Sequence, residues 1–264
     1  MQLKRRNPIF LSGSKTDRGK VRENNEDSLF VDNNIGFYMI ADGMGGQNAG
    51  EIASQMAVET LSQKLSEKFE TIHFSGLQSL GKAEIMKVIR TSLLDVNSMI
   101  REFSIKSTEV AGMGTTVVLA ICFSDVYYIV NLGDSRAYLW STNHGLKVLT
   151  KDHTMENELI RLGYGEQEID PQYKHMLTRW LGSPKIQASS IHIRKGNWHK
   201  NDCLLMCSDG LTNMLTDAEI RIIIEEHIKE GSQAVCNFLV ENGILKGGHD
   251  NITTIFVQNK YSQN

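Results

Sequence analysis

The chain has 264 residues, of which 41% are hydrophobic and 22% are charged, and its formal net charge at pH 7 is −3. This is ordinary globular composition, and the length fits either one large domain or two small ones. A net charge this small argues against binding to nucleic acid or to other polyanions.

The chain lacks the features that mark linkers, membrane spans and disulfide frameworks. It has only three prolines and no Ser/Gly/Pro-rich stretch, which predicts one compact domain over residues 1–264. No apolar run approaches the roughly 20 residues that cross a bilayer, and the basic start reads as the lead-in to a first strand. The cysteines lie in or beside apolar runs without a second pair at zinc spacing, so we expect four buried free thiols: Cys122, Cys203, Cys207 and Cys236. Together these features predict a cytoplasmic protein.

The first half of the chain predicts a hairpin followed by two helices. Ser28–Asp32 and Phe37–Asp42 are strand-like runs joined by an Asn-Asn-Ile-Gly turn. Apolar residues then recur at helical spacing over Ala49–Glu70 and again over Ala83–Phe103. The glycines at Gly76–Gly81 predict a tight connection and hence an antiparallel helix pair.

The second half predicts consecutive strands and a second pair of helices. The first run comprises the strands Thr115–Phe123, Val126–Leu132, Ala137–Trp140 and Leu146–Leu149. After a short helix over Thr154–Leu162, residues 163–184 are irregular. The remaining elements are two strands, two helices and a closing strand: Ile186–Ile193, Cys203–Cys207, Asp217–Glu230, Ser232–Asn242 and Ile252–Val257. Because helices come in pairs and strands in runs, antiparallel sheets with helices packed outside them are favoured, an α+β architecture.

Carboxylates stand at the ends of apolar strands, mostly beside glycine: Asp27, Asp42, Asp134, Asp209 and Asp250. Carboxylates gathered at sheet ends repel one another, and a divalent cation such as Mg²⁺ or Mn²⁺ removes that cost. The alternative is that each Asp-Gly pair is only a turn signal. Spacing alone does not decide whether the five acids meet in space.

Seven segments, in order, resemble the metal-dependent protein phosphatases of the PPM (type-2C) family in their bacterial form. They are TDRGKVRENNEDS, ADGMGGQNAGEIAS, GMGTT, NLGDSRAYL, LTKDHT, LLMCSDGL and GGHDNIT, and they span nearly the whole chain. The resemblance implies a four-layer αββα sandwich, in which two antiparallel β-sheets are flanked by pairs of antiparallel helices. It also implies that the acids at the sheet ends converge.

The resemblance further implies a metal centre of two Mn²⁺ or Mg²⁺ ions with room for a third. The residues that match the family's ligands to the two core ions are Asp42, Gly43 (through its carbonyl), Asp209 and Asp250. Asp27 and Glu26 match acids that hold metal-bound water, and Asp134 matches the third metal site.

The chemistry implied by this centre is direct hydrolysis of a phosphate ester. Two cations about 4 Å apart lower the pKa of a shared water far enough to form hydroxide, which attacks phosphorus in line without a phosphoenzyme. Arg22 matches the family's phosphate-binding arginine, and its planar fork can clamp two phosphate oxygens.

One departure from the family concerns the proton donor. Many family members carry a histidine at the position of Gln47 or of Met44, and neither residue found here donates a proton at neutral pH. The departing alkoxide needs protonation, for which the candidates are a water on a third metal near Asp134, His153 or His175. The alternative for both histidines is an exposed loop position.

Residues 163–184 occupy the place of the family's flap, which lies beside the active site. His175, Arg179 and Trp180 are expected to shape substrate choice there, and the alternative for Trp180 is to anchor the flap to the core.

We therefore expect a monomeric phosphatase that acts on phosphoserine and phosphothreonine in proteins, opposes a Ser/Thr kinase, and contacts neither nucleic acid nor membrane. A regulatory phosphatase-like module with weak or no catalysis is one alternative, suggested by Gln47. Another two-metal phosphoesterase, such as a nuclease or nucleotide hydrolase, is the second, and the absence of a basic or aromatic tract counts against it.

Overall fold

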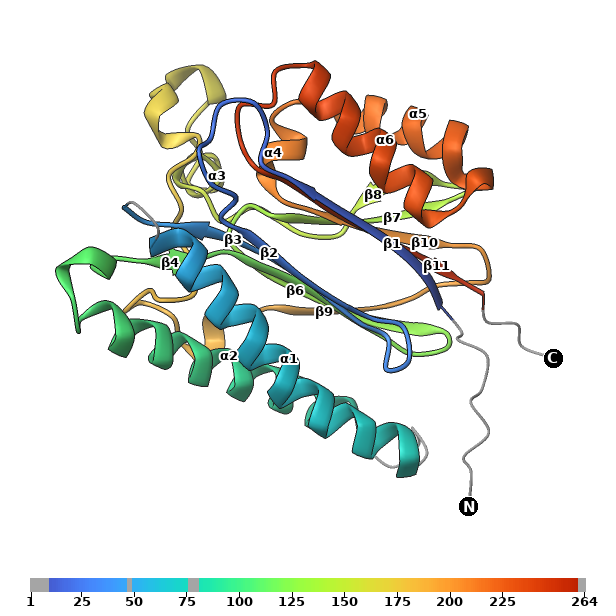
Figure 1. The fold of residues 1–264 in the computed structure, drawn as a ribbon, viewed down its shortest axis with the longest axis horizontal. Helices are drawn as coiled ribbons and strands as arrows, with labels where there is room; N and C mark the ends of the chain where they lie inside the picture. Colours follow the sequence, from blue (N-terminus) through green and yellow to red (C-terminus); the bar gives the residue numbers. More distant parts are fainter. Residues whose placement is uncertain (1–9, 47–48, 76–80, 261–264) are drawn as a thin grey trace.

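The computed structural model of the chain describes residues 10–46, 49–75 and 81–260, and it stacks two antiparallel sheets between two layers of helices (Figure 1). The first sheet has the strand order β1 (Phe10–Asp17), β11 (Ile252–Asn259), β10 (Cys203–Cys207), β7 (Arg136–Ser141) and β8 (Gly145–Val148). The second has the order β2 (Asp27–Asp32), β3 (Phe37–Met44), β5 (Val117–Cys122), β6 (Val126–Leu132) and β9 (Ile193–Asn197), with β4 (Gly114–Thr115) beside β3.

Each sheet carries a pair of long helices on its outer face. The antiparallel helices α1 (Ala49–Ser75) and α2 (Lys82–Ser104) cover the second sheet, and α5 (Asp217–His227) and α6 (Ser232–Leu245) cover the first (Figure 1). The predicted α+β fold, a four-layer αββα sandwich, is thus confirmed. Among the described residues, no helix is both long enough and apolar enough to cross a membrane.

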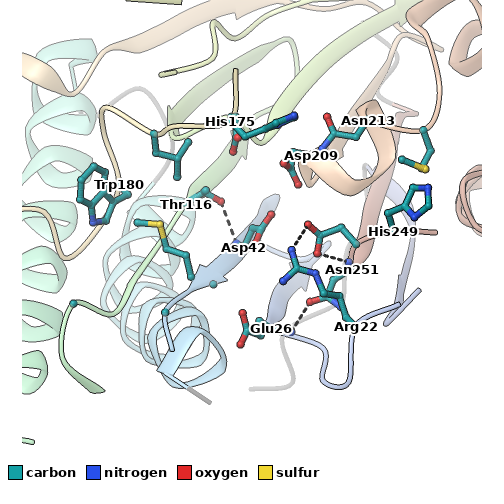
Figure 2. Close-up of a pocket in the computed structure, with 18 residues that line it drawn as sticks. Arg22, Glu26, Asp42, Thr116, His175, Trp180, Asp209, Asn213, His249 and Asn251 are labelled. Atoms are coloured by element: carbon teal, nitrogen blue, oxygen red, sulfur yellow. Dashed lines mark hydrogen bonds and ion pairs between the residues drawn. The ribbon is translucent and has the colours of Figure 1, made fainter. Parts of the chain in front are cut away.

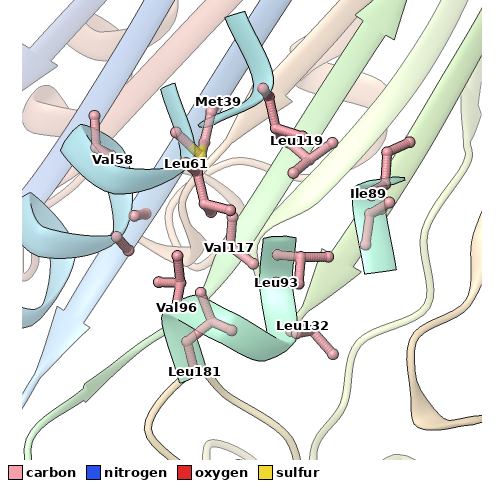
Figure 3. Packing of buried hydrophobic residues seen from close by; sticks show 14 of the residues in the cluster. Met39, Val58, Leu61, Ile89, Leu93, Val96, Val117, Leu119, Leu132 and Leu181 are labelled. Carbon is pink, nitrogen blue, oxygen red and sulfur yellow. The ribbon is translucent and has the colours of Figure 1, made fainter. Parts of the chain in front are cut away.

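Successive side chains of a strand point to opposite faces of its sheet, and this alternation explains why the layers stack. In β3, Phe37, Met39 and Ala41 belong to the core under α1 and α2, where Figure 3 labels Met39. Tyr38 and Ile40 belong to the core between the two sheets. All five side chains are inaccessible to solvent. Fully burying a large apolar side chain stabilises the fold by roughly 1.5–3 kcal/mol, so a strand that is buried on both faces fixes the position of its own end firmly.

Most predicted elements are confirmed within a few residues, and three predictions need correction. The strand expected over Ile186–Ile193 is wrong: Gln187 and Ser190 close a 3₁₀ turn through bonds of 2.8 and 2.7 Å, so β9 starts only at Ile193. Serine competes for backbone partners in this way and favours turns. The strand expected over Thr115–Phe123 is split at Thr116, and the helix expected over Asp217–Glu230 gives way to a 3₁₀ turn after His227. The connection predicted at Gly76–Gly81 lies almost wholly outside the described residues.

Two short helices bear on the site. The helix α3 (Met155–Arg161) starts at Thr154, whose hydroxyl caps it by accepting a bond from the Asn157 backbone N–H at 3.3 Å. The helix α4 (Asp209–Thr212) begins directly at an acid that we expected to end a strand. All four cysteines are buried, as predicted.

Candidate active site

A cavity of about 780 Å³ opens where strand ends of both sheets meet. Figure 2 shows Asp42 between Glu26 and Asp209 in this space. We call it the acidic cavity, after the carboxylates that line it: Glu26, Asp42, Asp134, Asp209 and Asp250. The structure therefore brings together most of the acids that the sequence singled out, although they are up to 224 positions apart in the chain, from Glu26 to Asp250.

Glycines let the start of α1 lie directly against the end of β3. A Cβ added to Gly43 would lie 2.0 Å from the carbonyl oxygen of Gly50, and one added to Gly50 would lie 2.5 Å from Oε2 of Glu26. The Gly43 N–H also donates to the Glu26 carbonyl at 3.1 Å. No side chain fits at either glycine without displacing this wall of the cavity.

Thr115 and Thr116 hold Asp42 by its backbone. The Asp42 N–H donates to Thr116 Oγ1 at 3.1 Å, and the Asp42 carbonyl accepts from the Thr116 N–H at 2.8 Å and from Thr115 Oγ1 at 2.9 Å. Thr116 Oγ1 also bonds Ser135 Oγ at 2.8 Å, beside Asp134. The GMGTT segment thus positions an acid of the cavity, a role that the sequence analysis did not identify.

Asp27 is buried behind the cavity wall, directly opposite Asp42 across the β2–β3 pair. Its Oδ2 accepts bonds from Ser208 Oγ at 2.8 Å and from Thr253 Oγ1 at 2.6 Å, whereas its Oδ1 has no partner within the described residues. Burial raises the pKa of Asp27 to about 7, against the opposing effect of the two hydroxyl donors and with a further contribution from Asp209 and Asp250. Asp27 is therefore poised to accept a further ligand or proton.

Arg22 and Asp250 form an ion pair at the mouth of the cavity. Arg22 donates through a terminal nitrogen to Asp250 Oδ2 at 2.8 Å, and Asp250 Oδ1 accepts from the Asn251 N–H at 2.8 Å. Burial lowers the pKa of Arg22, but the charge and hydrogen bond of Asp250 outweigh this and raise it overall. The Asn251 side chain in turn accepts from the Glu26 N–H and donates to the carbonyl of Arg18, so it ties the loop that carries Arg22 to the strand that follows.

The turn of α4 gives Asp209 a neighbour that the sequence analysis missed. Asn213 lies four residues on, at helical spacing, and donates through Nδ2 to Asp209 Oδ2 at 3.0 Å. If the sequence had predicted a helical turn at α4, the i,i+4 spacing would have identified Asn213 as a neighbour of Asp209.

The carboxylates of the cavity perturb one another. Burial raises the pKa of Asp42 well above its ordinary value, and the charges of Asp27, Asp209, Asp134 and Asp250 raise it further. Burial and then the charge of Asp209 raise the pKa of Asp134 to about 7. The pKa of Asp209 and that of Glu26 are raised as well, in both cases first by burial. Ionising these groups together at neutral pH therefore needs positive charge in the cavity.

The donor set suits hard divalent cations. Within the part of the chain that the structure describes, no three His, Cys, Asp or Glu side chains form a ready-made metal cage. The acids instead surround a shared space, with one buried carboxylate oxygen unpartnered and several pKa values raised. Carboxylate oxygens on a water-accessible cavity are the ligands that Mn²⁺ and Mg²⁺ take, so the residues fit the metal centre expected from the sequence.

The histidines considered as proton donors lie in different places. His175 lines the acidic cavity, and so does His249, which the sequence analysis passed over. His153 is buried in a different cavity, where its Nδ1 accepts from the Gly133 N–H at 3.2 Å. Met44 lines the acidic cavity, whereas Gln47 lies outside the described residues.

The irregular segment 163–184 is attached to β4 at its C-terminal end. Leu181 and Thr115 exchange backbone bonds of 2.8 and 3.0 Å, and a Cβ on Gly114 would lie 2.4 Å from the Trp180 ring. Trp180 also lines the acidic cavity, so it both anchors this segment and forms part of the wall. Arg179 points elsewhere, toward His153 and Glu158.

Comparison with known proteins gives consistent matches over nearly the whole chain. A family model described as protein phosphatase 2C matches residues 16–243. The serine/threonine phosphatase stp of Listeria monocytogenes is 35% identical over 255 residues, covering 94% of this chain and 96% of that protein. Among solved structures, the Streptococcus agalactiae serine/threonine phosphatase gives a TM-score of 0.80 at 29% identity, covering 94% and 99% of the two chains. The catalytic domain of the phosphatase PstP, solved with two manganese ions, gives 0.77 at 27% identity, covering 95% and 98%.

Proposed function

The chain belongs to the protein phosphatase 2C family and is a metal-dependent protein serine/threonine phosphatase, and we propose that the acidic cavity is where it hydrolyses phosphoserine and phosphothreonine on other proteins. The observation that carries this assignment is the meeting of five carboxylates with Arg22 in one cavity at the ends of two sheets.

Mn²⁺ or Mg²⁺ would be held in the acidic cavity by Asp42, the Gly43 carbonyl, Asp209 and Asp250. Asp134 and Asp209 would hold a third ion, and Glu26 and the buried Asp27 would fix water beside the pair. When bound, these cations neutralise the phosphate and lower the pKa of water, which supplies the nucleophile at neutral pH. The raised pKa values of Asp42 and Asp134 support this assignment, because cations restore the ionised form of crowded acids.

Arg22 would bind the phosphoryl group. Its guanidinium is half-exposed and fixed at one nitrogen by Asp250. Within the described part of the chain its other N–H groups have no hydrogen-bond partner, so they can donate to phosphate oxygens. Asp250 orients the planar guanidinium of Arg22. Charge-assisted hydrogen bonds from this guanidinium would stabilise the negative charge that develops as the ester bond breaks.

His175 would donate the proton that the leaving serine or threonine oxygen needs. It faces the cavity from the segment 163–184, which we propose is a flap on a single phosphatase domain spanning residues 1–264. Because an alkoxide is a poor leaving group, a donor on the side opposite the nucleophile is required.

The physiological partners proposed here are phosphorylated proteins that a Ser/Thr kinase has modified. We propose a monomer in the cytoplasm that binds neither nucleic acid nor membrane, in keeping with four buried thiols and a net charge of −3. The retained acids and the phosphatases among the relatives leave the non-catalytic alternative without support.

Phosphate release from a phosphothreonine peptide tests the proposal. We expect release with Mn²⁺, none with excess chelator, and little release from a panel of nucleotides. Preferential hydrolysis of the nucleotides would assign the chain to another class of two-metal phosphoesterase.

A further inference from the structure

A second cavity, of about 390 Å³, has the opposite character. We call it the basic cavity, after the cationic side chains and histidines among its lining residues: Lys151, His153, Arg161, Arg179, His192 and Arg194. They come from the loop after β8, from α3, from the end of the segment 163–184 and from the start of β9. None of the acids of the acidic cavity lines it.

The cations of the basic cavity outnumber the carboxylates available to them. Two acids line it, but Asp152 is occupied by Arg136, which bonds it at 2.7 Å through one nitrogen and at 3.0 and 3.1 Å through another. Glu158 alone serves two cations, Arg161 at 2.9 Å and Arg179 at 3.7 Å.

The other two cations lack an acidic partner. Among the residues that the structure describes, no carboxylate pairs with Lys151 or Arg194, and Arg194 donates only to the Leu149 carbonyl, at 2.9 Å. A concentration of positive charge in a chain of net charge −3 favours an anion in the cavity.

Two hydrogen-bond donors face each other inside the cavity. Because His153 Nδ1 accepts from the Gly133 N–H, the neutral ring carries its proton on Nε2. That nitrogen lies 3.5 Å from a terminal nitrogen of Arg179, which is also a donor. This Arg179 nitrogen already donates to the Ser190 carbonyl at 3.3 Å. An acceptor oxygen beside the two groups would take the proton of His153 Nε2 and the second N–H of this Arg179 nitrogen.

The positive charges of the basic cavity also affect the protonation of His153. Burial, and then the positive charges of Arg179, His192 and Lys151, lower the pKa of His153 to about 4, while Glu158 opposes the shift. His153 is thus a neutral donor at physiological pH, beside several permanent cations.

The two cavities are neighbours. A smaller hollow between them is lined by Asp134 and Asp209 of the acidic cavity and by Asp152 and Asn157 of the basic cavity. A peptide segment that crosses the start of α3 can therefore approach both.

We propose that the basic cavity binds a second phosphoryl group, distinct from the one hydrolysed in the acidic cavity. A phosphoryl dianion offers three acceptor oxygens, which match the guanidinium donors and the neutral His153. Its source is either a second phosphorylated residue of the substrate, an interpretation that rests on the proposed function, or free inorganic phosphate. Glu158 occupies Arg161 and Arg179 when the cavity holds no phosphoryl group and must release them to it.

The test compares peptides that carry one phosphothreonine with peptides that carry two, at separations of two to eight residues, with the Mn²⁺-loaded enzyme. The variants are Arg194→Ala and Lys151→Ala, with Glu158→Gln as a variant expected to free two arginines. Lys195→Ala is the matched control, because Lys195 is an exposed cation next along β9 that does not line the cavity. Turnover of p-nitrophenyl phosphate, which has one phosphoryl group, reports the acidic cavity alone.

For the wild type we expect kcat/KM to favour the doubly phosphorylated peptide about tenfold at one separation, the size of one charge-assisted hydrogen bond. Arg194→Ala and Lys151→Ala should remove most of this preference, Glu158→Gln should increase it, and Lys195→Ala should leave it intact. All four variants should hydrolyse p-nitrophenyl phosphate as the wild type does.

Equilibrium dialysis with labelled inorganic phosphate distinguishes the two sources. Preference for the doubly phosphorylated peptide assigns the cavity to the substrate. The basic cavity is assigned to free phosphate if the wild type binds a second equivalent of phosphate that Arg194→Ala does not bind, and if the enzyme shows no preference for the doubly phosphorylated peptide. If neither preference nor a second equivalent is found, the proposal is wrong, whereas a wild type inactive on p-nitrophenyl phosphate would instead contradict the proposed function.

Discussion

The acidic and basic cavities both concentrate like charges, but they differ in what holds the side chains. The acids project from strand ends and from the first turn of a helix, and Asp42 is fixed by three backbone bonds to two threonines. The basic cavity is lined by long, partly exposed side chains from α3, the segment 163–184 and β9.

This difference matches the two proposed roles, catalysis in the acidic cavity and substrate recognition in the basic cavity. A reaction centre needs groups held in place before the substrate arrives, because fixed charges lower the barrier without reorganising. A binding site for a phosphorylated segment tolerates flexible cations, whose charge attracts the ligand from several directions. Substitutions in the acidic cavity should therefore change turnover on every substrate, and those in the basic cavity only substrate preference.

The largest effect is expected for Asp209→Asn, which keeps the shape of the side chain and removes its charge. We expect kcat/KM for p-nitrophenyl phosphate with Mn²⁺ to fall by about 10³-fold, since several kcal/mol of metal-assisted charge stabilisation are lost. Asp217→Asn is the control, because Asp217 is an acid at the start of α5 that bonds Tyr138 and does not line the cavity. Equal losses in the two variants would mean that Asp209 has no special role.

Arg22→Ala should cost about 10²-fold in kcat/KM, the lower end of the range for losing a donor to a developing negative charge. Arg22→Lys keeps the charge without the planar fork and should recover only part of the loss. Steady-state kinetics on a phosphothreonine peptide measures both variants. Full activity of Arg22→Ala would show that the arginine only supports Asp250.

His175→Gln should slow the phosphothreonine peptide about tenfold more than p-nitrophenyl phosphate, whose leaving group needs little protonation. Gln47→His restores the histidine that the family resemblance implies at this position, and it should bring the kcat values for the two substrates closer together. The ratio of the two kcat values is the readout. A ratio unchanged in both variants would remove histidine from the proton transfer.

The smallest effect concerns stability in the absence of metal. Asp27 and Asp134 have folded pKa values of about 7, above those of an unfolded chain. The stability that they contribute is complete below the unfolded pKa and is lost as pH rises through the folded value. With chelator present, the thermal midpoint should therefore fall by about 2–4 °C between pH 6.5 and 8, for a change of about 1 kcal/mol.

The depressed pKa of His153 works in the opposite direction, but only as pH falls below about 6.5, outside this window. Mn²⁺ should raise the midpoint more at pH 8 than at pH 6.5, and Asp134→Asn should flatten the metal-free profile. A metal-free midpoint that rises toward pH 8 would contradict the crowding of ionised acids.

The sequence predicted the layers well, because continuous apolar runs in the central strands and helical spacing in α2 are local signals. It failed at 186–193, where isoleucines at both ends suggested a strand and the Gln187–Ser190 bonds instead close a turn. That outcome depends on a side-chain bond that no periodicity reveals.

In the acidic cavity, the sequence identified the carboxylates, but only the family resemblance implied that they converge. Asn213 and Thr116 were missed because their roles depend on the α4 turn and on the break in the strand at Thr116. His153 and His175 looked alike as loop histidines, yet one is buried beside Gly133 and the other faces the acids. Tertiary contacts, which the local sequence does not reveal, determine where each of the two histidines lies.

The most direct test of the central claim, that the acidic cavity holds divalent cations, is the number of Mn²⁺ ions bound by the chelator-treated chain. Calorimetric titration should find at least two, the number in the related PstP structure, for both the wild type and Asp217→Asn, and fewer for Asp209→Asn. The same number for Asp209→Asn and the wild type, or no binding at all, would contradict the account.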